Sequence, residues 1–167
     1  MSRFAIAIYC DDIRHEVGNK LSFLGVYSQN MFVPSFPARL PKLCVAVWAR
    51  TPESNPFKRL ALKLYSNESV LMDQELPTVA WDEVPDPPPS VPLPGEDVES
   101  MHTVHFAIQL APFNLDAAAI LRLRVDTGNG VLKAGGLNIQ LSSPSKANPT
   151  SGPRSSRKSR SRSSRAR

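Results

Sequence analysis

The chain has 167 residues, of which 41% are hydrophobic, and this size and composition predict one folded domain with appendages. No apolar run approaches the about 20 residues that a membrane-spanning helix needs. The longest run, Phe4 to Tyr9, is too short for the apolar region of a signal peptide. We therefore expect a cytoplasmic protein without a membrane span.

Charge is divided unevenly along the chain. The formal net charge is +5, but residues 142–167 carry eight basic side chains and no acidic one. The residues before them carry 12 basic and 15 acidic side chains. The basic character therefore belongs to the C-terminal segment, and the remaining body is mildly acidic.

The first predicted strand leads into a polar connection. Residues 4–10 are rich in β-forming side chains and predict a strand covered on both faces. Residues 11–19 are dense in charge and predict a turn. Asp11 or Asp12 could cap a single helical turn there, with Glu16 completing a capping box.

A second strand is predicted at residues 20–27. Gly18 and Asn19 supply the positive φ that ends the preceding turn. Gly25, inside the strand, indicates a bulge or a close approach of other backbone. The segment after this strand carries three prolines that exclude regular strand pairing and predict an extended crossover, namely Pro34, Pro37 and Pro41.

The clearest strand covers residues 42–50. Both of its faces are apolar, so we expect it at the centre of a sheet. Residues 59–65 alternate between apolar and polar side chains, which is typical of a strand with one wet face. A turn at Asn67 and Glu68 then leads to a further strand at residues 70–75.

Three more strands are expected in the C-terminal half, at residues 102–110, 120–125 and 131–141. A brief helical turn is expected at residues 115–119. The last strand contains Gly135 and Gly136, a pair that indicates a β-bulge.

Together these patterns predict an all-β protein, an antiparallel β-sandwich of about seven to nine short strands formed by residues 1–141. No alternation of strands with helices occurs, so a parallel α/β sheet is excluded. The order of the strands in the sheets cannot be derived from these patterns.

An acidic, proline-rich loop is predicted at residues 82–99. It contains six prolines and six acidic side chains without a basic one. Such a composition favours an extended, solvated loop of polyproline type. The alternative is a ligand for an aromatic groove of another protein.

The segment 142–167 is predicted to be disordered because it lacks apolar side chains that could be buried. It interleaves serines with cations, which could bind DNA or RNA phosphates without sequence specificity, an acidic protein or an anionic membrane. The alternative is a solubilising appendage. The candidate nucleic-acid-binding residues are Arg154, Arg157, Lys158, Arg160, Arg162, Arg165 and Arg167.

The charged turn is the main candidate for a site. Its acids and His15 match no known spacing of metal ligands, and Arg14 supplies a counter-charge to its neighbours. The simplest interpretation is a surface turn with a local ion pair and caps, and the alternatives are a loop that contacts a protein partner and a divalent-ion site. As a functional site, the turn is a better candidate for recognising a partner than for chemistry. The candidate partner-binding residues are Asp11, Asp12, Arg14, Glu16 and Lys20.

No pattern of catalytic residues is present. The chain has no nucleophile motif of the G-x-S-x-G type. Cys10 and Cys44 lie in apolar runs and are interpreted as reduced, buried thiols. His102 and His105 are three residues apart, which places them on opposite faces of a strand. We expect no enzymatic activity and no cofactor.

The N-terminal third carries a distinctive set of residues, Cys10-Asp-Asp-Ile-Arg, Glu16, Gly18, Lys20-Leu-Ser, Gly25-Val-Tyr and Val33-Pro-Ser-Phe-Pro. With these residues the chain resembles a family of short, uncharacterised bacterial and bacteriophage proteins over about residues 4–141. The resemblance implies no catalytic residues. We expect a non-enzymatic binding or structural module of such an origin, or alternatively a protein that associates with nucleic acid through its tail.

Overall fold

The computed structural model describes residues 2–18, 20–76 and 100–142. Within these residues the chain forms strands and no helix, so the prediction of an all-β protein is confirmed. The acidic, proline-rich loop and the basic tail lie outside the described residues. Among the described residues there is also no helix long and apolar enough to cross a membrane.

The described residues form twelve strands, more than the seven to nine expected. The N-terminal half contains β1 (Phe4–Cys10), β2 (Asp12–Glu16), β3 (Lys20–Leu24), β4 (Asn30–Val33), β5 (Ala38–Leu40), β6 (Leu43–Pro52), β7 (Ala61–Ser66) and β8 (Ser69–Glu75). The C-terminal half contains β9 (Met101–Leu110), β10 (Phe113–Leu115), β11 (Ala119–Asp126) and β12 (Val131–Leu141).

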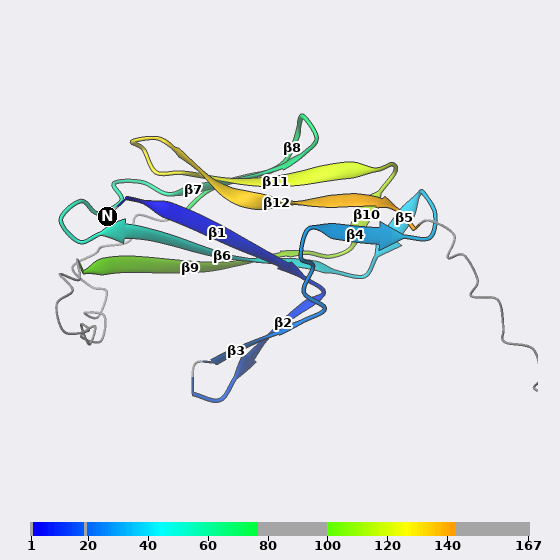
Figure 1. Ribbon diagram of the computed structural model, residues 1–167, viewed down its shortest axis with the longest axis horizontal. Coiled ribbons are helices and arrows are strands. Elements are labelled where there is room, and N and C mark those ends of the chain that lie inside the picture. Colours follow the sequence, from blue (N-terminus) through cyan, green and yellow to red (C-terminus); the bar gives the residue numbers. More distant parts are fainter. Residues whose placement is uncertain (1, 19, 77–99, 143–167) are drawn as a thin grey trace, which may run out of the picture.

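Two main sheets face each other and form the sandwich (Figure 1). One has three strands in the order β1-β6-β9, and the other has five in the order β4-β12-β11-β7-β8. All pairings in these sheets are antiparallel except that of β12 with β4, which is parallel. A short two-stranded sheet of β10 and β5 lies at one end.

The core lies between the two main sheets. Alternate side chains of β6, β7, β11 and β12 point into it and lose almost all contact with solvent, as expected for strands with a period of two. Its largest fully buried side chains include Leu43, Val45, Val47, Leu64, Leu121, Leu123, Leu137 and Ile139. β6 lies at the centre of its sheet, as its two apolar faces predict.

The bulge expected near Gly135 and Gly136 is present. The register between β11 and β12 shifts after Leu123, which pairs with Gly135, and Gly135 has a φ of 120°. A Cβ atom added to Gly136 would lie 2.5 Å from the Leu121 carbonyl oxygen. The glycines therefore allow β12 to bend and to approach β11 closely.

The prediction for residues 11–19 was wrong. These residues do not form a turn with a helical cap, because residues 12–16 are strand β2, which pairs with β3. Gly18, with a φ of 81°, has the expected turn conformation, and Asn19 lies outside the described residues. The second predicted strand is also shorter than residues 20–27, since β3 ends at Leu24 and Gly25 has a φ of 63°.

Two further predictions were wrong. The proline-rich segment 34–41 was expected to lack strand pairing, but β5 lies inside it and pairs with β10. Residues 115–119 were expected to form a helical turn, but they contain the end of β10, a bend and the start of β11. Both errors concern strands of three residues, which are too short to show an alternating pattern.

Candidate functional site

A β-hairpin projects from the sandwich and is called the arm here; it consists of β2, β3 and the turn between them. It leaves the end of β1 on the side away from the five-stranded sheet (Figure 1). The Asp11 N–H donates to the Leu24 carbonyl (2.9 Å), and the Tyr27 N–H donates to the Tyr9 carbonyl (2.8 Å). These two hydrogen bonds join both ends of the arm to β1.

The base of the arm depends on Gly25. Its φ of 63° is a left-handed conformation that side chains disfavour. A Cβ atom at this position would lie 1.9 Å from the Asp11 carboxylate. That carboxylate accepts a hydrogen bond from the Tyr27 hydroxyl, and burial together with this contact raises the pKa of Tyr27. The Asp11 carboxylate therefore belongs to the hydrogen-bonded base of the arm.

Asp12 is held by an ion pair with Lys42, which lies just before β6. The Arg14 guanidinium lies 3.6 Å from the same carboxylate. The hydrogen bond from Lys42 holds the pKa of Asp12 below its usual range, and the pKa of Lys42 is raised in turn. This contact connects the first residue of the arm to the central strand of the three-stranded sheet.

The arm has an apolar face that lies toward the sheet. Ile13 pairs with Phe23 and His15 pairs with Leu21, so these four side chains share one face of the hairpin. The Phe23 ring contacts Trp48 of β6 edge to face, with centroids 5.7 Å apart.

Trp48 extends this contact to β9. Its ring lies 4.7 Å from the His105 imidazole, which it faces at an angle of 35°. Burial and the neighbouring charge of His15 lower the pKa of His105, so this imidazole is neutral at pH 7. The arm is thus packed near its base, through Phe23, on the outer face of the three-stranded sheet, and its tip projects away (Figure 1).

The beginning of the arm covers two cysteines. Cys10 and Cys44 pair across β1 and β6, and both are free and buried, as the sequence predicts. They point away from the core between the sheets, since their neighbours Tyr9 and Val45 point into it. Their burial on an outer face shows that the arm shields this end of the sheet.

The opposite face of the arm is charged. Asp12, Arg14, Glu16 and Lys20 share it, and Glu16 lies directly across from Lys20 in the register. The structure therefore brings together four of the five residues predicted to bind a partner. Val17, at the tip, is 95% exposed. Sequence reasoning missed Lys42, Phe23 and Trp48, because their contacts with the arm join distant parts of the chain.

His102 and His105 lie on opposite faces of β9, as their spacing predicts. His105 points to the outer face. Among the described residues no group of three His, Cys, Asp or Glu side chains could hold a metal ion. The seven candidate nucleic-acid-binding residues of the tail lie outside that part of the chain.

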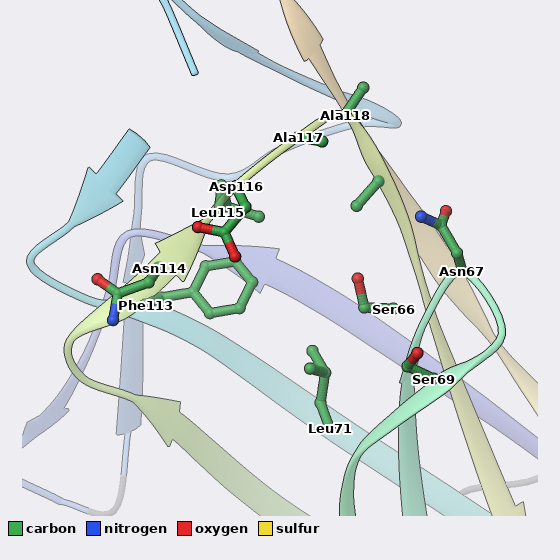
Figure 2. Close-up of a pocket in the computed structure, with 11 residues that line it drawn as sticks. Ser66, Asn67, Ser69, Leu71, Phe113, Asn114, Leu115, Asp116, Ala117 and Ala118 are labelled. Atoms are coloured by element: carbon green, nitrogen blue, oxygen red, sulfur yellow. The ribbon is translucent and has the colours of Figure 1, made fainter. Parts of the chain in front are cut away.

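A cavity of about 290 Å³ lies between the β7–β8 turn and the segment around β10 (Figure 2). Asp116 is the one titratable side chain among the residues that line it. Asn67 is engaged in the fold, because its side-chain oxygen accepts a hydrogen bond from the Ile120 N–H at 2.9 Å. The Asp116 carboxylate therefore has no second titratable side chain in the lining of this cavity with which it could exchange a proton.

Comparison with known families matches residues 5–140 to the family model DUF6941. The chain belongs to this family of unknown function. The match to DUF6941 includes the arm and both main sheets, and it ends before the basic tail. No curated protein matches the chain.

Proposed function

We propose that this member of DUF6941 is a non-enzymatic binding module of bacterial or bacteriophage origin, acting in the cytoplasm through its arm. The observation that carries the proposal is the division of the arm into two faces. Phe23 packs on Trp48 on one side, while Arg14, Glu16 and Lys20 are exposed on the other. Asp12 shares this second face but is paired with Lys42 at its base.

This division suits recognition of another protein. The base of the arm is fixed by two backbone hydrogen bonds and by the ion pair of Asp12 with Lys42. A fixed arm loses little conformational entropy when it binds. Its charges alternate in sign, which favours a partner with a complementary pattern and gives specificity and a fast association rate.

Several arrangements support a role without catalysis. The Asp12 carboxylate is paired with Lys42 and lies near Arg14, so its charge is compensated. Burial raises the pKa of the Cys10 thiol to about 11, which keeps it protonated and a poor nucleophile at pH 7. The cavity beside β10 offers only one carboxylate.

The test begins with affinity capture of the full chain in bacterial lysates, with and without phage infection, and continues with binding of the purified partner. We expect the double variant Arg14→Glu, Lys20→Glu to weaken binding at least tenfold, which corresponds to about 1.4 kcal/mol. The control is Lys58→Glu, Lys133→Glu, which changes the same net charge at exposed positions elsewhere. Equal binding by both variants, or no partner, contradicts the proposal.

A second candidate function is non-specific association with DNA or RNA through the tail. It is favoured by the eight basic side chains and the absence of acids in residues 142–167. Six phosphate contacts would change affinity by roughly a thousandfold between low and moderate salt. The full chain and a chain ending at Leu141 should then differ on both nucleic acids at low salt. Equal binding, or none, contradicts this candidate.

A further inference from the structure

In the described part of the chain, the two main sheets have four edge strands, and three of these are short, charged or covered. β4 has only four residues. β8 carries Asp73 and Glu75, and its ladder with β7 contains a register shift. β1 lies against β12, as the carbonyl of Ala7 is 4.0 Å from a Cβ position at Gly135. These are features that discourage pairing with another chain.

β9 differs from these edges. It is the last strand of its sheet and pairs with β6 over ten consecutive residues without a register shift. Its sequence, Met-His-Thr-Val-His-Phe-Ala-Ile-Gln-Leu, has no acid, lysine, arginine, proline or glycine. Within residues 2–18, 20–76 and 100–142 no strand pairs with its other side.

The direction of the unpaired backbone groups follows from one hydrogen bond. The Ser100 carbonyl accepts from the Glu53 N–H (2.9 Å) and therefore points toward the chain that continues from β6. Backbone groups alternate in direction along an antiparallel strand. The N–H and C=O groups of Thr103, His105, Ala107 and Gln109 consequently point to the open edge.

The side chains of β9 that face the core are incompletely covered. Val104 and Phe106 are only partly buried, whereas Ala49 and Val47, their partners in β6, are fully buried. Apolar surface thus continues to the edge of the sandwich, beside backbone groups that no strand in the described ranges pairs with. A further strand at this edge would bury both.

We propose that β9 pairs with β9 of a second copy of the chain, in antiparallel orientation, so that the two three-stranded sheets join into one sheet of six strands. The lack of charge on β9 favours this occupant, because two identical edges then meet without like-charge repulsion. The interface is self-complementary about a two-fold axis. Both arms lie on the same side of the joined sheet. If the arm binds a partner, as in the proposed function, the dimer presents two such arms and can bind bivalently.

The oligomeric state is tested by sedimentation of the full chain over about a hundredfold range of concentration. We expect a dimer for the wild type and a monomer for Ala107→Lys and for Thr103→Lys, which place charges at exposed positions of the edge. The control is Val70→Lys on the exposed edge strand β8, which should remain a dimer. A monomeric wild type, or folded β9 variants that still form dimers, overturns the proposal.

Amide exchange measured by NMR identifies the surface. The Thr103, His105, Ala107 and Gln109 amides should be protected at high concentration and exchange on dilution, while the Val104 and Phe106 amides stay protected throughout. Protection of the first group in a monomer would show that the chain itself covers the edge. Exchange of that group within a dimer would place the interface elsewhere. Either result overturns the proposal.

Discussion

Cys10 and Cys44 lie directly opposite each other in the ladder of β1 and β6, and both thiols are buried beneath the start of β2. Burial raises the pKa of Cys10 to about 11 and raises that of Cys44 as well. The arm therefore covers a pair of protonated thiols.

This arrangement predicts slow reaction of both thiols with a thiol reagent at pH 8. The thiolate is the reactive form, and neither burial nor the raised pKa favours it. We expect labelling of the native protein to be at least a hundredfold slower than labelling in denaturant. Replacement of Phe23 by Ala should speed the native reaction, because it loosens the arm from Trp48. Native labelling as fast as in denaturant would show that the arm does not stay on the sheet.

The contact of Gly25 with Asp11 predicts a stability difference between two glycine variants. Gly25→Ala places a Cβ atom where the Asp11 carboxylate lies and strains the backbone, so we expect a loss of about 2–4 kcal/mol of unfolding free energy. Gly18→Ala also has a positive φ but nothing within 4 Å, so only the backbone strain remains, about 1 kcal/mol. Urea unfolding measures both. Equal losses would mean that the base of the arm adapts freely.

The arm shows where sequence patterns suffice and where they fail. β6 could be predicted as a central strand because both of its faces are apolar. The bulge at Gly135 could be predicted because a pair of glycines inside a strand is typical of a β-bulge. β2 could not be predicted as a strand, because its sequence, Asp-Ile-Arg-His-Glu, contains only one aliphatic side chain. The other apolar side chains of that face, Phe23 and Leu21, come from β3. Only the pairing of the two strands makes that face visible.

The composition of the candidate segment could be read from the sequence, but its geometry could not. The crowding of charges between residues 11 and 20 marks the stretch that contains β2 and the start of β3. A turn, however, would have presented these side chains in all directions. Pairing of β2 with β3 places Asp12, Arg14, Glu16 and Lys20 on one face of the arm. Asp11 lies at the base instead, where its carboxylate accepts a hydrogen bond from Tyr27, 16 residues away in the chain.

The ion pair of Asp12 with Lys42 predicts a stability difference that depends on pH. The pKa of Asp12 is lowered from its ordinary value of 3.8, so the unfolded state takes up the proton first as the pH falls. The contribution of the pair is complete above pH 3.8 and is lost as the pH falls through the lower, folded pKa. The urea midpoint of Asp12→Asn should therefore lie below that of the wild type at pH 7 and approach it in acid.

Glu16→Gln is the matched control for that series. It removes one carboxylate from the same face of the arm, but Glu16 is exposed, and surface charges contribute little. Its urea midpoint should follow the wild type at every pH. A constant deficit of Asp12→Asn from neutral to acid pH would show that the charge of Asp12 is not what stabilises the arm.

The contact between Trp48 and His105 predicts a fluorescence titration. The imidazole is neutral at pH 7, and its protonation places a cation 4.7 Å from the indole ring, where it quenches the emission. We expect a midpoint below pH 6.5, measured in a Trp81→Phe background so that Trp48 alone emits. Because the charge of His15 contributes to the shift, His15→Gln should move the midpoint upward. His102→Gln, on the opposite face of β9, should leave it unchanged, and a transition that persists in His105→Gln would disprove the assignment.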